Sequence, residues 1–282
     1  MHTTTASSSR ADRMAVPHRI TIIVPVYNAE EYISTALASI AAQSRPPDEV
    51  IVVDDASTDQ TVALVKRWTS LLPLVLLENA TNEGLGATRR TGIARATGDL
   101  VALLDADDYL MPDHLEVLLA TWLEHGGIAA ADDYRWVPGY RLGNASWIRR
   151  VVPPADKQPR EILAGNFGSY CSLFSRDDYE RAGGFRPLRK SEDWDLWIRM
   201  VRSGVPIVPA SNVTMIYRKR VDSLSADGGC LDADIELLSS FLNDLSVSDR
   251  GVAVRALRRL RAEVEYLAGF EELERRQGSC WD

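Results

Sequence analysis

The first hundred residues alternate buried-looking strands with amphipathic helices, and this alternation constrains the fold more than any other feature. Residues Ile20–Val26 are almost continuously apolar and β-branched, which is typical of a strand buried on both faces of a parallel sheet. Ile33, Leu37 and Ile40 then recur at helical spacing between about Glu30 and Gln43. The unit repeats, with strands expected over 50–53, 74–77 and 100–104 and helices over 59–69 and 87–96. The sequence therefore predicts an α/β fold with a doubly wound, mostly parallel sheet flanked by helices.

The regular alternation of strands and helices ends after residue 108. We expect a helix that starts near Pro112, strands over 128–136 and 206–217, an irregular stretch over 137–167, and helices over 177–182 and 193–203. Two further helices from about Asp232 form a C-terminal helical appendage. The expected organisation is a disordered tail over 1–18, one domain made of two halves over 19–110 and 111–225, and a C-terminal helical region over 226–282.

Composition excludes several classes of protein. The chain of 282 residues is 45% hydrophobic, so it can bury a full core. Its 32 basic and 40 acidic residues give a net charge of −8, which argues against a nucleic acid partner. Three distant cysteines, Cys171, Cys230 and Cys280, do not suggest a disulfide framework and fit a reducing compartment.

No membrane-spanning or export signal is recognisable. The longest apolar runs stay well short of the roughly 18 residues that a membrane helix needs, and the Ser/Thr-rich start has no apolar core of a signal peptide. We therefore expect a cytoplasmic protein without a transmembrane segment. Peripheral contact of the Arg-rich C-terminal helix with anionic lipid stays open beside the alternative of a solvated helix face.

Acidic residues follow several of the predicted strands. Asp54-Asp55 and Asp105-Ala106-Asp107-Asp108 come directly after apolar runs, and ligands of open parallel sheets bind beyond such strand ends. Carboxylates separated by one residue can hold Mg²⁺ or Mn²⁺ together with a phosphate group, although a turn followed by a helix cap would use the same residues. Asp54 and Asp55 suit recognition of a nucleobase N–H, with helix capping by Ser57, Thr58 or Asp59 as the plainer alternative.

A glycine-containing loop precedes the helix expected over 87–96. Gly84 and Gly86 begin a dinucleotide-binding pattern, but its third glycine position is Arg89, so the Rossmann interpretation fails. The loop could still offer backbone N–H groups or the Arg89 guanidinium to a phosphate, with a solvated helix start as the alternative.

Further candidate residues lie at the start of the helix expected over 193–203 and beside the later strands. Glu192 and Asp193 lie at a helix N-terminus, where the macrodipole favours ionised carboxylates, and Asp193 suits a general base with Glu192 as the alternate. Trp136 could stack on a sugar ring or pack in the core, and Asp132 could border the acceptor pocket. Tyr217-Arg218-Lys219-Arg220 could close over a diphosphate or be a surface charge run.

Four ordered motifs resemble the family 2 glycosyltransferases of the GT-A fold over roughly residues 19–225. They are Ile23–Asn28, Val53–Asp59, Asp105–Asp108 and Glu192–Trp194. The resemblance implies a metal-assisted, inverting transfer of one sugar from a nucleotide diphosphate sugar to an acceptor hydroxyl, with UDP-sugars favoured and Mg²⁺ or Mn²⁺ as cofactor. Residues 19–110 would then be the nucleotide-sugar-binding half and 111–225 the acceptor-binding half.

The resemblance also implies roles by position. The nucleobase and ribose pocket would be lined by Val26, Asn28 and Asp55, with support from Asp54. Asp105 would face the ribose or donor sugar, and the donor site would be completed by Pro25, Gly84, Arg89 and Ala106. Asp107 would bind the metal, Asp193 would be the base, and Trp194 would pack beneath the acceptor. The chain has Thr88-Arg89-Arg90 where the family usually has Ala-Arg-Asn, and it lacks the Gln-x-x-Arg-Trp signature of the processive synthases, which implies a single addition.

Two other functions and several acceptors stay open. A nucleotidyltransferase should have a glycine-rich loop with Arg and Lys directly after the first strand, where this chain has Tyr27-Asn28-Ala29. A donor-binding scaffold without catalysis would have no need of both Asp107 and Asp193. A glycan, a lipid carrier, a peptide or a small molecule could each be the acceptor.

Overall fold

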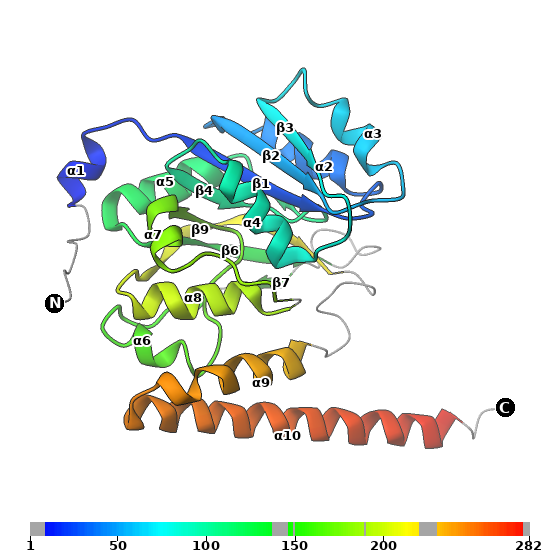
Figure 1. Cartoon of the computed structure of the whole chain (residues 1–282), viewed down its shortest axis with the longest axis vertical. Coiled ribbons are helices and arrows are strands. Elements are labelled where there is room, and N and C mark those ends of the chain that lie inside the picture. The colour runs from blue at the N-terminus through cyan, green and yellow to red at the C-terminus, as the bar shows by residue number, and fades with distance from the viewer. Residues whose placement is uncertain (1–8, 137–145, 149, 189, 220–229, 279–282) are drawn as a thin grey trace.

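The computed structural model describes residues 9–136, 146–148, 150–188, 190–219 and 230–278. A nine-stranded sheet lies at its centre with helices on both faces, and two C-terminal helices lie along one end (Figure 1).

The first four strands of the alternating pattern form the parallel part of the sheet, as predicted. They are β1 (Ile20–Val26), β2 (Glu49–Asp54), β3 (Leu74–Glu78) and β4 (Leu100–Leu103), in the spatial order β3-β2-β1-β4. The register pairs Val26 with Asp54 and Ile23 with Leu103, so the carboxyl ends of β1, β2 and β4 share one edge. This edge carries the candidate site.

The second half of the sheet is mixed. Strand β8 (Ser172–Ser175) runs antiparallel to β4, β6 (Ile128–Trp136) antiparallel to β8, and β9 (Ile207–Arg218) parallel to β6. The short strands β5 (Tyr109–Leu110) and β7 (Ser146–Ile148) pair antiparallel with β9 and β6. The strands predicted over 128–136 and 206–217 are confirmed.

Helices cover both faces, which explains why β1 is apolar throughout. Ile20, Ile22 and Val24 pack with α2 (Ile33–Ala41), α3 (Thr61–Lys66) and α5 (His114–His125), whereas Ile23 packs with the opposite group. That group consists of α4 (Leu85–Arg95), α6 (Gln158–Glu161), α7 (Arg176–Arg181), α8 (Glu192–Arg202), α9 (Cys230–Phe241) and α10 (Val247–Gly278), with a 3₁₀ turn over Leu242–Asp244. Each residue of β1 is therefore buried on one face of the sheet or the other.

Part of the segment expected as a disordered tail, over 1–18, forms a short helix in the structure. Helix α1 (Arg10–Met14) lies against α5, and the buried Arg13 donates from Nε to the Leu123 carbonyl at 3.1 Å and from Nη2 to the Glu124 carbonyl at 3.0 Å. These carbonyls belong to the last turn of α5, where partners from the same helix are missing. The capping of α5 by a distant arginine orders residues that have little apolar periodicity of their own.

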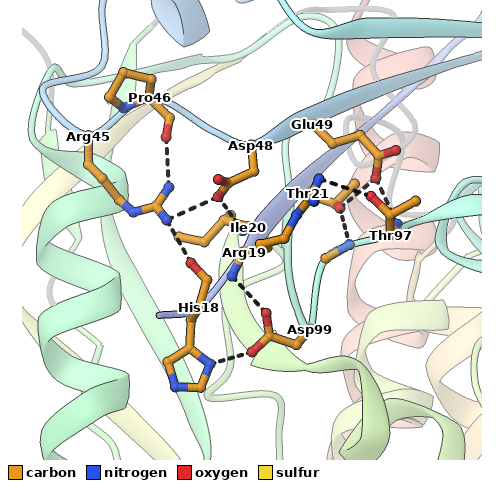
Figure 2. A network of polar contacts seen from close by, with 11 residues as sticks. His18, Arg19, Ile20, Thr21, Arg45, Pro46, Asp48, Glu49, Thr97 and Asp99 are labelled. Carbon is orange, nitrogen blue, oxygen red and sulfur yellow. Dashed lines mark hydrogen bonds and ion pairs between the residues drawn. The ribbon is translucent and has the colours of Figure 1, made fainter. Parts of the chain in front are cut away.

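Acidic residues also occur at the amino ends of the strands, and there they serve the fold (Figure 2). Asp48 accepts a hydrogen bond from the Ile20 N–H at 2.8 Å, and Asp99 accepts one from the Arg19 N–H at 2.7 Å. Glu49 accepts from the Thr21 hydroxyl and from the Thr97 N–H, both at 2.8 Å. These carboxylates satisfy backbone donors at the edge opposite the candidate site.

The predicted C-terminal helical appendage is confirmed. Leu237 and Leu238 of α9 and Ala253, Leu257 and Leu260 of α10 are buried in the same core as α8. Among the described residues, no helix is long and apolar enough to cross a membrane.

Candidate functional site

The candidate site lies where the carboxyl ends of β1, β2 and β4 meet the N-termini of α4 and α8. Asn28, Asp55 and Asp105 follow the three strands, and Arg89 and Glu192 come from the two helices. The convergence that the strand-end pattern predicts is therefore present for these groups.

Asp55 holds the loop that begins α4. Its Oδ1 accepts from Asn79 Nδ2 at 2.8 Å and from the Glu83 N–H at 2.9 Å, and its Oδ2 accepts from the Gly84 N–H at 2.8 Å. Gly84 has φ of 86°, a left-handed conformation that glycine adopts without steric cost. Asp55 thus fixes the glycine loop beside the carboxyl end of β2.

Gly86 allows α4 to approach the segment before α8. A Cβ atom at Gly86 would lie 2.8 Å from the Arg186 carbonyl oxygen and 3.1 Å from that of Leu188, closer than side chains tolerate. The Gly-x-Gly pattern therefore has a packing explanation in this chain. It lets α4 lie close to the segment that leads into α8.

Asn28 and Asp54 shape the turn after β1 and β2. Asn28 is left-handed, with φ of 46°; its N–H donates to Ser57 Oγ at 2.9 Å and its Oδ1 accepts from the Thr58 N–H at 2.8 Å. Asp54 Oδ2 accepts from the Ser57 N–H at 3.0 Å, whereas the buried Asp54 Oδ1 has no hydrogen-bond partner. A buried carboxylate oxygen without a donor is costly, so it suits a ligand N–H. Pro25 and Val26, the last residues of β1, are buried beneath this turn.

A buried arginine links α4 to α8 and to the turn after β4. Arg89 on α4 is 1% exposed; Nη1 pairs with Glu192 Oε1 at 2.5 Å and Nη2 with Asp105 Oδ1 at 2.6 Å. The guanidinium also lies over the rings of Tyr170 and Phe185, at 5.4 and 5.8 Å from their centroids. The sequence does not predict this bridge, because Arg89, Asp105 and Glu192 are far apart along the chain.

Burial changes the protonation of two of these acids. The pKa of Glu192 is raised to about 7 by burial, with a further contribution from Asp193, while Arg89 acts in the opposite direction. The pKa of Asp108 is raised well above its usual range by burial and by Asp107 and Asp105. Asp108 accepts from the Tyr170 hydroxyl and, at 2.7 Å, from the Arg218 N–H. Asp108 therefore connects the acidic turn Asp105–Asp108 to the end of β9.

Asp105 and Asp107 have the chemistry of a divalent cation site. Asp105 is partly exposed and Asp107 is half-buried in the turn after β4, with Ala106 buried between them. Among the described residues, no group of three or more His, Cys, Asp or Glu side chains could enclose a metal. A site for Mg²⁺ typically has one or two carboxylates completed by substrate phosphates, so the residues present fit such an ion.

Asp193 is held at the first turn of α8. Its Oδ2 accepts from Asn166 Nδ2 at 3.1 Å, and its Oδ1 accepts from the Trp194 N–H at 2.7 Å. Trp194 is 3% exposed and donates from Nε1 to the Ile162 carbonyl at 2.8 Å, so it packs under the segment that carries Asn166. Asn166 lies within residues 137–167, where the sequence predicts an irregular stretch, and no sequence signal marks it.

The remaining candidates lie elsewhere or are only partly described. Asp132 accepts from the Arg150 N–H at 2.9 Å, and neighbouring Asp133 pairs with the Arg150 guanidinium at 2.8 Å. Trp136 ends β6, but its side chain lies outside the described residues. In the basic run Tyr217-Arg218-Lys219-Arg220, the Arg218 guanidinium lies 4.8 Å from the centre of the Tyr32 ring, and Arg220 lies outside the described residues.

Known proteins share this architecture. The chain is 27% identical to the amylovoran biosynthesis glycosyltransferase AmsE of Erwinia amylovora, over 74% of this chain and 79% of that protein. Solved structures match its fold: TarS of S. aureus in complex with UDP-GlcNAc has a TM-score of 0.66 at 22% identity, covering 86% of this chain and 71% of that one. The mannosyltransferase PcManGT of Pyrobaculum calidifontis, in complex with GDP-Man and Mn²⁺, has a TM-score of 0.58 at 21% identity, covering 94% and 86%.

The sequence match to full-length TarS of Staphylococcus aureus is 39% identical but spans only 38% of this chain and 19% of that protein. The family comparison covers more. Residues 21–183, more than half of the chain, match the model described as Glycosyl transferase family 2, and they contain the ends of β1, β2 and β4 and the acidic turn Asp105–Asp108. The chain therefore belongs to glycosyl transferase family 2.

Proposed function

We propose that this chain transfers one sugar, with inversion, from a nucleotide diphosphate sugar to an acceptor hydroxyl. The observation that carries the proposal is the Arg89 bridge, because it joins Asp105 on the donor side to the helix that presents Asp193 on the acceptor side. A single displacement needs donor and base on opposite sides of the reacting carbon, at a fixed separation.

The donor would occupy the strand-end crevice. Asn28, Asp54 and Asp55 would form the nucleobase and ribose pocket, where the partnerless Asp54 Oδ1 offers an acceptor for a base N–H. Asp107 would hold Mg²⁺ or Mn²⁺, which supplies charge neutralisation at the departing diphosphate. TarS and PcManGT were solved with UDP-GlcNAc and GDP-Man, so UDP- and GDP-sugars are the donors to screen first.

The acceptor would meet Asp193 at the end of α8. Asn166 orients its carboxylate, which would take a proton from the acceptor hydroxyl. Buried Trp194 would support this segment from below. Trp136 and Asp132 stay candidates for the acceptor side.

Asp193→Ala tests the base assignment. Turnover should fall by about 10² or more, since general-base catalysis typically contributes that much, while the donor-induced thermal shift with Mn²⁺ should persist. Asp177→Ala is the matched control, because Asp177 is also an acid in the first turn of a helix but is exposed on α7. Near-normal turnover of Asp193→Ala would refute the base. No metal-dependent release of nucleoside diphosphate from the wild type would instead favour a donor-binding scaffold.

A further inference from the structure

A pocket of about 380 Å³ lies between α6 and α10, apart from the strand-end crevice. Its volume falls within the range of small-molecule sites. Arg160 and Glu161 line it from α6 and Ala164 from the segment that follows, and Val252, Arg255, Ala256 and Arg259 line it from α10.

The pocket exists because small residues face each other between the two elements. Ala164 lies opposite a face of α10 on which Val252 and Ala256 are four residues apart, so the two apolar residues stack on one side of the helix. Arg255 and Arg259 follow these positions by three residues and extend from the same face. The lining thus combines an apolar part, in which Val252 and Ala256 are buried and which is called the floor here, with three exposed arginines, called the rim.

Three guanidinium groups surround this floor. Arg259 Nη2 donates to the Ala164 carbonyl at 2.7 Å, which fixes one side of the rim. Among the described residues, no carboxylate lies within 4.0 Å of the Arg160 or Arg255 guanidinium, and Glu161 contributes a single negative charge to the lining. Neighbouring arginines differ: Arg202 pairs with Asp249 at 3.2 Å, and Arg250 donates to the Leu242 carbonyl.

Arg160, Arg255 and Arg259 are exposed at the edge of the pocket and form a local positive patch in a chain whose net charge is −8. Arginines four residues apart on one helix face repel each other, and a third from α6 adds to the repulsion. An anion with several oxygens would relieve it, since guanidinium groups bind phosphate through paired hydrogen bonds.

One segment that lines the pocket also reaches the candidate base Asp193. Ala164 forms part of the pocket lining, and Asn166, two residues later, donates to Asp193. A ligand bound here would therefore contact the segment that orients the candidate base.

We propose that the pocket between α6 and α10 binds a phosphate-bearing ligand through Arg160, Arg255 and Arg259. This site is separate from the donor crevice and does not depend on the transfer reaction. The phosphate could belong to a soluble molecule or to a lipid headgroup, because both present the same oxygens.

Calorimetric titration of the full chain with pyrophosphate and with inorganic phosphate, in EDTA, tests the first source. Arg160→Gln/Arg255→Gln should weaken binding at least about tenfold, whereas Arg258→Gln, an exposed arginine of α10 outside the lining, should not. Arg259 is left in place because it holds the Ala164 carbonyl. Ala164→Leu keeps every charge but fills the hollow, and it should weaken binding as well.

Vesicle flotation tests the second source, with phosphatidylcholine alone and with added phosphatidylglycerol. Loss of binding to the soluble probes in the double variant would support a soluble phosphate ligand, and loss of binding to anionic vesicles alone would support a headgroup. The proposal is overturned if the wild type binds none of the probes. It is equally overturned if the double variant, with an unchanged melting temperature, binds them as tightly as Arg258→Gln does.

Discussion

Replacement of Arg89 by methionine should expose the cost of two carboxylates that share one buried cation. Arg89 is 1% exposed, and the Glu192 side chain that it contacts at 2.5 Å is 7% exposed. Removal of one partner from a buried ion pair typically costs about 3–5 kcal/mol, because the other charge is left without compensation. Methionine keeps much of the apolar stem, so cavity formation adds little to this cost.

The protonation of Glu192 limits the loss. Its pKa is about 7 with Arg89 present, and it should rise further without that cation, so the carboxyl can become neutral. We therefore expect Arg89→Met to lower the free energy of unfolding by about 3 kcal/mol at about pH 8 and by clearly less at about pH 6. Glu192→Gln/Arg89→Met should regain about 2 kcal/mol of the sum of the single losses, since residue 192 then carries no charge that lacks a partner, while Asp105 loses Arg89 in both variants.

Urea denaturation at the two pH values measures these differences. Arg90→Met is the matched control, because Arg90 is the next residue of α4 and is exposed; its effect should stay within about 0.5 kcal/mol. A loss below about 0.5 kcal/mol for Arg89→Met at about pH 8, or strict additivity in the double variant, would refute the bridge as a buried, coupled pair.

Three further predictions concern titration, packing and metal dependence. The pKa of Glu192 is raised by folding, so its contribution to stability is full below the unfolded value of 4.5 and is lost as pH rises through about 7; Glu192→Gln should flatten that fall in urea titrations, and an unchanged slope would contradict the assignment. Gly92→Ala should lower the free energy of unfolding by about 1–3 kcal/mol, because a Cβ there would lie 2.7 Å from Ile23 Cγ2, whereas Gly251→Ala, 3.6 Å from its nearest neighbour, should be neutral or stabilising. Asp107→Asn should abolish the increase in donor-induced melting shift that Mn²⁺ gives over EDTA, and a variant that keeps the full increase would remove Asp107 from the metal site.

The local pattern of the chain was enough to predict the alternating elements and the parallel half of the sheet. Ile20–Val26 is apolar on both faces because helices cover both faces, and that requirement is visible in the sequence itself. Helix ends were less accurate. The helix expected over 59–69 is α3, Thr61–Lys66, since Asp59 lies outside it and accepts from the Thr61 N–H at 2.9 Å.

The candidate site was predictable where its residues follow strands and unpredictable where they meet across the fold. The sequence predicts that Asp55 and Asp105 lie near each other, because the parallel strands before them end at a common edge of the sheet. Asp55 anchors the glycine loop, however, by accepting from the Asn79 side chain and from the Glu83 and Gly84 N–H groups, and only the folded position of the segment before α4 brings these donors to it.

The sequence by itself determined the fold class, the family and the set of acidic residues at the strand ends, because these depend on periodicity and on short ordered motifs. Only the tertiary structure decided how those acids are used. Arg89 joins Asp105 to Glu192, and Asn166 joins an irregular segment to Asp193. The physical reason is that ion pairs and buried hydrogen bonds depend on distance in space. The packing of α4 beside the segment before α8 sets that distance for residues that are far apart in the sequence.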